Sequence, residues 1–313
     1  MRILITGAHG LLGQKLALII GRETAHELLL TDLAPRTFFI NSRFDYQQLD
    51  ITQLGDVKSL VGSYRPDVII NTAALTNVDA CEEDRLGAWR LNVDGVKNLM
   101  IPARRLDGCR IVQVSTDYVF DGRSGPYDEH ARPHPVSYYG KSKLAAENAL
   151  VSGPVEYIIA RTQVLYGTGY EVRQNFVSWV LSKLEQGVPF RVVDDQRGNP
   201  TLADDLAFGI LKLLERRCAG IYHVSGPESV DRFSFALKIA EIFGFSPSLI
   251  SATTSEEIGQ AANRPPDSTF ITLKFEAACQ ERLSDTTRGL ERLRQQIRDG
   301  AEHTGLLNDR RFI

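Results

Sequence analysis

The sequence lacks several features that mark particular protein classes. Its four cysteines are far apart and form no CxxC motif or Cys/His cluster, so neither a metal site nor a redox motif is predicted. No run of 18 apolar residues is present, and no membrane-spanning helix is expected. The first residues lead directly into a strand pattern without a signal-peptide layout. With thiols expected to be free, these absences favour a cytoplasmic protein without a membrane partner.

Charge of one sign is also scarce. The chain has 36 Lys and Arg against 39 Asp and Glu, a formal net charge of −3. A nucleic-acid binder usually carries a basic stripe, so no nucleic-acid partner is expected. The hydrophobic content of 43%, with 25 Gly and 13 Pro, is ordinary for a globular protein. The length of 313 residues fits one large domain or two, at about 150 residues each.

The first half of the chain alternates short apolar runs with helical stretches. Strands are expected at residues 2–6, 27–31, 67–71, 110–115 and 156–160. Helices are expected between them, at residues 11–22, 84–105 and 139–151. This alternation is typical of βαβ units around a parallel sheet. Runs that are apolar on both faces, such as Val68-Ile69-Ile70, favour a sheet covered on both sides.

The alternation becomes less regular after about residue 161. Further helices are expected at residues 175–186, 202–217, 234–243 and 286–300. Further strands are expected at residues 189–194 and 220–225. Residues 253–268 are polar, contain Pro265-Pro266 and are expected to form a loop, and residues 301–313 a tail. No low-complexity linker is present, so a second domain should pack against the first.

A glycine-rich loop follows the first predicted strand. It reads Gly7-Ala-His-Gly10-Leu-Leu-Gly13 and opens a predicted helix. Gly7 would allow the tight turn, Gly10 would let the backbone approach a pyrophosphate at the helix N-terminus, and Gly13 would allow close helix–strand packing. The position between a strand and a helix in one βαβ unit predicts a dinucleotide site. His9 is interpreted as incidental.

An acidic residue stands where such a site needs one. Asp32 lies nineteen residues after Gly13, at the end of the second predicted strand, where an acid binds the adenosine ribose hydroxyls of NAD. Its charge should repel the 2′-phosphate of NADP, although Arg36 is close enough in sequence to soften that repulsion. The alternative is that Asp32 only begins the turn that contains Pro35.

A second constellation is Tyr139-Gly-Lys-Ser-Lys143, at the start of a predicted helix. Tyr139 and Lys143 are spaced i, i+4 and share a helix face. A nearby ammonium lowers the pKa of a phenol, so Tyr139 could transfer a proton to a carbonyl oxygen. Thr116 ends an earlier predicted strand and is placed to hydrogen-bond the same carbonyl, because ligands of open α/β sheets bind outside the carboxyl ends of the strands.

Together these residues resemble the extended short-chain dehydrogenase/reductase superfamily, which Asn71-Thr-Ala-Ala74 and Leu91-Asn-Val-Asp94 also fit. Within it, the chain most resembles dTDP-4-dehydrorhamnose reductases, through residues 65–71, 115–122, 138–147, 195–201 and Arg264-Pro265. The resemblance covers residues 1 to about 300. It implies a Rossmann-type doubly wound parallel sheet with a smaller C-terminal α/β substrate lobe.

The resemblance also implies a division of the chain. Residues 1–161 plus 202–225 would form the dinucleotide-binding domain, and residues 162–201 plus 226–313 the substrate-binding lobe.

The resemblance further implies a role for each matched position. Thr116, Tyr139 and Lys143 would form the catalytic triad. Cofactor contacts, to NAD(H) or NADP(H), are expected at Gly7, Gly10, Leu11, Leu12, Gly13, Asp32, Asp50, Ile51, Ala73, Ala74, Tyr139 and Lys143. Contacts to a nucleotide-sugar are expected at Thr116, Val164, Asn175, Gln196 and Arg264. The alternatives are that Asp50 and Asn175 only cap helices and that Arg264 is a solvated loop charge.

One position departs from the reductase pattern. After Arg161-Thr162, rhamnose-pathway reductases usually carry a Trp that packs on the sugar ring, whereas this chain has Val164 there. The β subunit of methionine adenosyltransferase, a non-reductase relative, also has an aliphatic residue at this place.

The sequence therefore predicts NAD(P)H-dependent reduction of the C4 keto group of a nucleotide-linked 6-deoxy sugar. Two alternatives stay open: a nucleotide-sugar epimerase, and a non-catalytic dinucleotide-binding regulatory subunit like that of methionine adenosyltransferase. Dehydratases commonly carry an Asp-Glu pair after the Thr, whereas this chain has Asp117-Tyr118. A homodimer is compatible with the sequence, which does not fix the oligomeric state.

Overall fold

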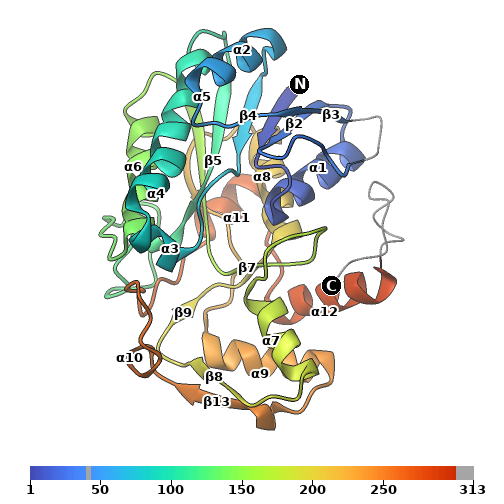
Figure 1. Ribbon diagram of the computed structural model, residues 1–313, viewed down its shortest axis with the longest axis vertical. Coiled ribbons are helices and arrows are strands. Elements are labelled where there is room, and N and C mark those ends of the chain that lie inside the picture. Colours follow the sequence, from blue (N-terminus) through green and yellow to red (C-terminus); the bar gives the residue numbers. More distant parts are fainter. Residues whose placement is uncertain (40–43, 301–313) are drawn as a thin grey trace.

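Seven parallel strands form the central sheet, in the order β11-β6-β5-β4-β1-β2-β3 (Figure 1). The computed structural model describes residues 1–39 and 44–300. The strands are β1 (Arg2–Thr6), β2 (Glu27–Asp32), β3 (Phe44–Gln48), β4 (Val68–Asn71), β5 (Arg110–Thr116), β6 (Glu156–Thr162) and β11 (Gly220–His223). From β1 the chain first adds β2 and β3 on one side and then β4, β5 and β6 on the other. The direction of the connections therefore reverses between β1 and β4. Ligands of doubly wound folds bind at this switch point, and the predicted Rossmann-type fold is confirmed.

Helices cover both faces of this sheet. They are α1 (Leu11–Glu23), α2 (Leu54–Tyr64), α5 (Gly95–Ala103), α6 (Tyr138–Val151), α8 (Ala203–Glu215) and α11 (Leu273–Cys279). Two short helices, α3 (Val78–Glu83) and α4 (Arg85–Trp89), pack against the start of α6. Ile3 and Ile5 of β1 belong to the apolar cluster beneath α1 and α8, whereas Leu4 belongs to the cluster beneath α2, α5 and α6. Successive strand side chains point to opposite faces, so a strand buried on both sides must be apolar throughout.

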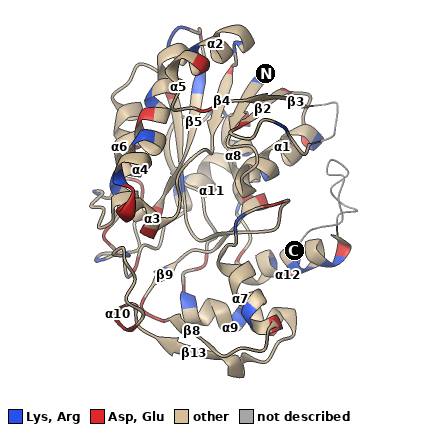
Figure 2. Ribbon diagram, in the orientation of Figure 1, with Lys and Arg blue, Asp and Glu red and all other residues tan. Residues whose placement is uncertain are grey.

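A smaller group of elements packs beside the carboxyl edge of the sheet, in the lower half of Figure 1. Its strand pair is β8 (Phe190–Val193) with β13 (Ile250–Thr253), in parallel register. The helices α7 (Phe176–Glu185), α9 (Arg232–Phe243) and α12 (Thr286–Asp299) share a third apolar cluster with this pair. Figure 2 shows Lys and Arg interspersed with Asp and Glu in both halves of the molecule.

Short elements connect the two halves. They are β7 (Leu165–Tyr166) with β10 (Thr201–Leu202) and β9 (Arg197–Gly198) with β12 (Val230–Asp231). Further short elements are the helix α10 (Ser255–Ile258) and the 3-10 turns η2 (Asp117–Val119) and η3 (Pro247–Leu249), of which η3 lies between α9 and β13 in the smaller half. Between β10 and β12 the chain returns to the large sheet, where β11 pairs with β6. Every helix among residues 1–39 and 44–300 is too short or too polar to cross a lipid bilayer.

Most expected elements are present within a few residues of their predicted bounds, but β13, α3 and α11 were not predicted, and further differences follow. The helix expected at residues 84–105 is divided by a π-helical turn, η1 (Arg90–Asp94). The loop expected at 253–268 contains α10. The sequence did not predict β3, a mostly exposed edge strand, or α2, whose two glycines weaken its helical signal. The predicted tail, 301–313, lies outside the described residues.

The glycine loop shows why its residues are glycine. Gly7 has φ +68°, and a Cβ there would lie 2.7 Å from the backbone nitrogen of Ala73. A Cβ on Gly13 would lie 2.7 Å from the Cα of Ala8 and closer still to the carbonyl oxygen of Gly7. These contacts are with backbone atoms, which cannot rotate away, so α1 starts this close to β1 only without side chains at these positions.

Replacing Gly13 should therefore destabilise the fold. We expect Gly13→Ala to lower the free energy of unfolding by about 1–3 kcal/mol, the usual cost of overpacking. The matched control is Gly62→Ala in the exposed part of α2, where a Cβ meets nothing within 4 Å. That variant should gain about 0.5–1 kcal/mol from helix propensity. Urea unfolding measures both, and equal stability of the two variants would contradict the packing argument.

Candidate active site

The glycine loop and Asp32 meet at the carboxyl edge of β1 and β2. Gly10 caps α1 without a side-chain hydrogen bond, so no side chain caps the amides of the first helical turn. Such a helix N-terminus favours an anion. The carboxylate of Asp32 accepts hydrogen bonds from the backbone N–H of His9 (2.9 Å) and of Leu33 (2.7 Å). Asp32 is therefore held directly beside the loop, as the sequence predicts.

His9 has a structural role that the sequence did not indicate. Its ring stacks on Tyr46, with ring centroids 5.2 Å apart, and lies against Phe38. Burial lowers the pKa of His9, although the charge of Asp32 opposes the shift. A neutral ring packed among aromatic side chains fixes the middle of the glycine loop.

The other predicted cofactor positions lie around the same crevice. Ala73 and Ala74 follow β4, and Ala73 lies against Gly7. Leu11 and Leu12 begin α1, and the side chain of Leu12 lies in the apolar core, which leaves only its backbone for a ligand. These positions form a continuous line along the carboxyl edge.

Asp50 and Ile51 follow β3 and carry structural roles as well. Burial would raise the pKa of Asp50, but hydrogen bonds from Thr52 and Gln53 hold it below its usual range. Its carboxylate accepts the backbone N–H of Thr52 at 2.9 Å in a local turn, whereas the N-cap of α2 is Gln53, so Asp50 does not cap that helix. The side chain of Ile51 is buried against Gly95, and its carbonyl accepts a hydrogen bond from Asn98 (2.9 Å).

Thr116, Tyr139 and Lys143 come together at the ends of β5 and α6. The hydroxyl of Thr116 donates to Asp117 (3.0 Å) and accepts from the backbone N–H of Tyr118 (3.2 Å). The ammonium of Lys143 donates to the carbonyl of Val114 on β5 at 2.7 Å. Tyr139 is buried, and burial raises its pKa, although a hydrogen bond with Thr116 opposes the shift. The constellation predicted from the sequence is thus assembled in one place.

The prediction that Lys143 lowers the pKa of Tyr139 was wrong. The spacing predicted a phenol pKa lowered by the ammonium, but desolvation dominates and raises it. Burial also lowers the pKa of Lys143 to about 8, although Glu147 opposes the shift. Both groups are therefore biased toward their neutral forms, and Tyr139 holds a proton that it can donate.

Two side chains that the sequence did not single out support this arrangement. Asn92 in η1 is buried, accepts the backbone N–H of Leu75 (2.8 Å) and donates to Ser142 on α6 (3.0 Å). Asp117 accepts hydrogen bonds from Thr116 and, at 2.5 Å, from Ser268. Burial raises the pKa of Asp117 to about 6 against these hydrogen bonds. The bonds of Asn92 with Leu75 and Ser142, and of Asp117 with Ser268, join residues that are distant in sequence, so the sequence did not indicate these supporting contacts.

A buried ion pair lies on the same helix. Glu147 stands one turn beyond Lys143 on α6 and binds Arg161 of β6 through two hydrogen bonds, of 3.0 and 2.6 Å. Both side chains are only 2% exposed. Arg161 also lies over the ring of Phe120 and 3.5 Å from His223. Burial, with the charge of Arg161, lowers the pKa of His223 to about 3, so this histidine is neutral.

A cavity of about 360 Å³ opens beside the constellation. Tyr118 lines it and meets Tyr139 edge to face, with ring centroids 5.8 Å apart. The described lining also includes aromatic, basic and amide side chains: Phe176, Trp179, Arg191, Val192, Val193, Gln196, Arg232, Ile258, Gln260 and Arg264. Three guanidinium groups around one cavity suit a ligand that carries more than one negative charge.

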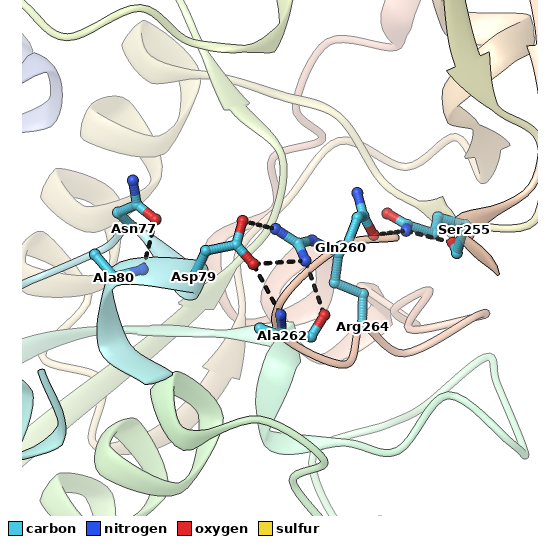
Figure 3. A network of polar contacts seen from close by, with 8 residues as sticks. Asn77, Asp79, Ala80, Ser255, Gln260, Ala262 and Arg264 are labelled. Carbon is cyan, nitrogen blue, oxygen red and sulfur yellow. Dashed lines mark hydrogen bonds and ion pairs between the residues drawn. The ribbon is translucent and has the colours of Figure 1, made fainter. Parts of the chain in front are cut away.

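The predicted substrate positions divide into two groups. Gln196 and Arg264 line the cavity. Asn175 is not among its lining residues: it caps α7 by accepting from the backbone of Ser178 (3.1 Å) and donates to the carbonyl of Gly167 (2.8 Å). Val164 is not among them either, and its φ of +45° is unusual for a β-branched residue. Arg264 is not a solvated loop charge, because it forms an ion pair with Asp79 (Figure 3).

Comparison with known proteins places this geometry in context. Residues 1–298 match the family model for the RmlD substrate binding domain. The dTDP-4-dehydrorhamnose reductase of Aggregatibacter actinomycetemcomitans is 35% identical over 94% of this chain and 98% of its own length. Methionine adenosyltransferase 2 subunit beta of Xenopus tropicalis is 34% identical over 84% of this chain and 78% of its own.

A solved structure extends the comparison. The dTDP-4-dehydrorhamnose reductase of Bacillus anthracis, solved in complex with NADP, aligns with a TM-score of 0.81 and 34% identity. The alignment covers 94% of this chain and 98% of that one. The resemblance predicted from the sequence motifs is confirmed.

The buried ion pair generates a stability prediction. Glu147→Gln leaves the charge of Arg161 without its partner, and we expect the free energy of unfolding to fall by about 3–5 kcal/mol. The double variant Glu147→Leu/Arg161→Met removes both charges and should lose markedly less, because no buried charge is left unpaired. Urea unfolding of the two variants decides the matter. If the double variant is the less stable, packing rather than charge holds α6 against β6.

Proposed function

The chain belongs to the RmlD substrate binding domain family, and on that premise we propose that it reduces the C4 keto group of a nucleotide-linked 6-deoxy sugar. It is an NAD(P)-dependent oxidoreductase of the extended short-chain dehydrogenase/reductase type, like its reductase relatives. The observation that carries the proposal is the assembly of Thr116, Tyr139 and Lys143 next to a cavity lined by three arginines.

The carboxyl edge of the sheet fits a nicotinamide dinucleotide. The N-terminus of α1 and the backbone at Gly10, where a Cβ would meet only the carbonyl oxygen of Gly7 within 4 Å, would hold the pyrophosphate, while Gly7 and Gly13 let α1 start this close to β1. Asp32 would bind the adenosine ribose. Further contacts to the cofactor would come from Asp50, Ile51, Ala73 and Ala74. When bound, NADH or NADPH supplies the hydride. Residues 1–161 plus 202–225 would thus serve as the dinucleotide-binding domain.

The chain's own residues would then manage the proton. Tyr139, protonated in its buried environment, would donate a proton to the C4 carbonyl oxygen of the sugar as negative charge develops on it. Thr116 would hydrogen-bond the same oxygen and keep the carbonyl in place. The ammonium of Lys143 would stabilise the phenolate that Tyr139 leaves behind.

The cavity would take the nucleotide-sugar. Arg191, Arg232 and Arg264 would bind the diphosphate, since guanidinium groups make paired, charge-assisted hydrogen bonds to phosphate. Trp179 and Phe176 offer apolar faces for a base. Asn175 would act through its cap, which places Phe176, and Gln196 would act from the cavity wall. Val164 stays a predicted substrate position, in a substrate lobe of residues 162–201 plus 226–313.

The similarity to methionine adenosyltransferase 2 subunit beta favours a second candidate, a regulatory subunit that binds a dinucleotide without turnover. It would co-purify with a catalytic partner and reduce no keto-sugar. Homodimer formation and a cytoplasmic location also stay predictions, and mass measurement in solution tests the former.

Removal of the phenol tests the reductase. Purified protein should oxidise NADH or NADPH when given dTDP-4-dehydrorhamnose, and Tyr139→Phe should lower kcat by about 10²–10⁴-fold, the usual contribution of general acid catalysis. The control is Tyr157→Phe on β6, which should leave the rate unchanged. Absorbance at 340 nm follows both. A Tyr139→Phe variant with full activity would refute this mechanism, and no turnover by the unaltered protein would favour the regulatory subunit.

The pKa of Lys143 predicts how the rate varies with pH. Because this pKa lies near 8, the charged form declines as the pH rises through 8. The value of kcat/KM reports ionisations of the free enzyme, so it should fall above about pH 8. Initial rates between pH 6 and 10 at constant ionic strength measure the profile. A value that stays constant up to pH 10 would show that the charge of Lys143 is not required.

A further inference from the structure

The segment of residues 255–264 contributes Ile258, Gln260 and Arg264 to the cavity lining and is fastened at both ends (Figure 3). At its start, the hydroxyl of Ser255 donates to Asp195 (2.7 Å) and accepts from Gln196 (2.7 Å). Gln196 also donates to Gln260 at 2.8 Å. These contacts attach the segment to the residues that follow β8, in the smaller half of the molecule.

The other end is fastened to the larger half by one carboxylate. Asp79, on α3, accepts the backbone N–H of Ala262 at 2.9 Å. It also accepts two hydrogen bonds from the guanidinium of Arg264, of 3.1 Å from Nη1 and 2.7 Å from Nη2. In Figure 3 the carboxylate of Asp79 faces both groups. The two residues are separated by 185 positions, so this contact exists only in the folded chain.

The pairing leaves a defined part of Arg264 available. Asp79 occupies the edge formed by Nη1 and Nη2, and Nη1 also donates to the carbonyl of Ala262 at 2.8 Å. The edge formed by Nε and the second hydrogen of Nη2 takes part in none of these bonds. That edge carries two parallel N–H groups, the arrangement that matches two phosphate oxygens. Arg264 is 13% exposed and lines the cavity, whereas Asp79 is not among the lining residues.

The charges around the cavity give Asp79 a second effect. Arg191, Arg232 and Arg264 repel one another across the cavity that they line. A carboxylate bound to the outer edge of Arg264 offsets part of this repulsion without entering the cavity. An arginine side chain also loses much conformational freedom when it binds a ligand, and a side chain already held in place loses less.

We propose that Asp79 is a positioning residue, which holds the guanidinium of Arg264 with its free edge toward the diphosphate of the substrate and fastens residues 255–264 across the cavity. The proposal rests on the function proposed above. It assigns Asp79 a role in affinity for the diphosphate and none in the chemical step.

The test compares ligands with and without the diphosphate. Calorimetric titration of the full-length protein with dTDP should give a dissociation constant about tenfold higher for Asp79→Asn than for the unaltered protein. Competition titration with thymidine should give dissociation constants for the two proteins that agree within twofold, because thymidine carries no phosphate for Arg264 to bind. Affinity for NADPH and kcat should be unchanged, while KM for the nucleotide-sugar rises with the dTDP constant. Asp79→Glu should restore part of the affinity.

The matched control is Glu83→Gln, which removes an exposed carboxylate from the same helix and should change neither constant. If Asp79 has a purely structural role, Asp79→Asn should weaken the binding of thymidine and of dTDP by the same factor. That result would overturn the proposal. Unchanged or tighter dTDP binding would overturn it as well. Failure of the unaltered protein to bind dTDP would instead refute the proposed function itself.

Discussion

The ion pair between Glu147 and Arg161 is the contact on which the geometry of the proposed catalytic side chains depends. It joins α6, the helix that carries Tyr139 and Lys143, to β6, the strand next to the edge strand β11, and both charges lie almost wholly out of water. A buried charge tolerates neither loss of its partner nor much displacement from it, so the pair fixes the rotation and height of α6 against the strands. Tyr139, Lys143 and Glu147 follow one another at four-residue spacing on one helix face. The side chains proposed to meet a substrate are therefore positioned by a buried ion pair on the same helix.

The molecule joins two halves that also meet near the glycine loop. The glycine loop belongs to the large sheet, but Gln14 behind it donates to the carbonyl oxygens of His9 (2.7 Å) and Tyr170 (2.8 Å) and accepts the backbone N–H of Tyr170 (2.8 Å). The loop that contains Tyr170 leads to Asn175, whose cap begins α7 and presents Phe176 to the cavity. Polar contacts thus run from the predicted cofactor site to the wall of the cavity. These contacts between the two halves are hydrogen bonds from a side chain to defined backbone groups.

The sequence predicted those parts of the site that local spacing determines. Gly7 and Gly13 were identifiable because a turn and a close helix–strand contact require glycine within one βαβ unit, and Tyr139 and Lys143 because helical spacing places them on one face. The partners of Asp79 and Glu147 were not, because each bond joins residues that only the completed fold brings together. Asn175 fits both a cap and a ligand contact by sequence, and its hydrogen bonds with Ser178 and Gly167 establish the first. The predicted direction of the pKa shift of Tyr139 was wrong for a similar reason. Burial outweighs the neighbouring charge, and residue spacing carries no information about burial.

The raised pKa of Tyr139 bears on whether the proposed site favours reduction or oxidation. A phenol whose pKa is raised by burial keeps its proton throughout the neutral range, and it can serve as an acid without prior ionisation. A lysine whose pKa is lowered to about 8 is charged at neutral pH but gives up that charge at a modest cost. As a proton leaves Tyr139, the negative charge on its oxygen would stabilise the ammonium of Lys143, so the two shifts reverse together when charge develops in the site. Reduction begins with both protons in place, whereas oxidation would need Tyr139 ionised against its own desolvation. The buried site therefore favours proton donation at neutral pH, and the reverse reaction should gain only as the pH rises.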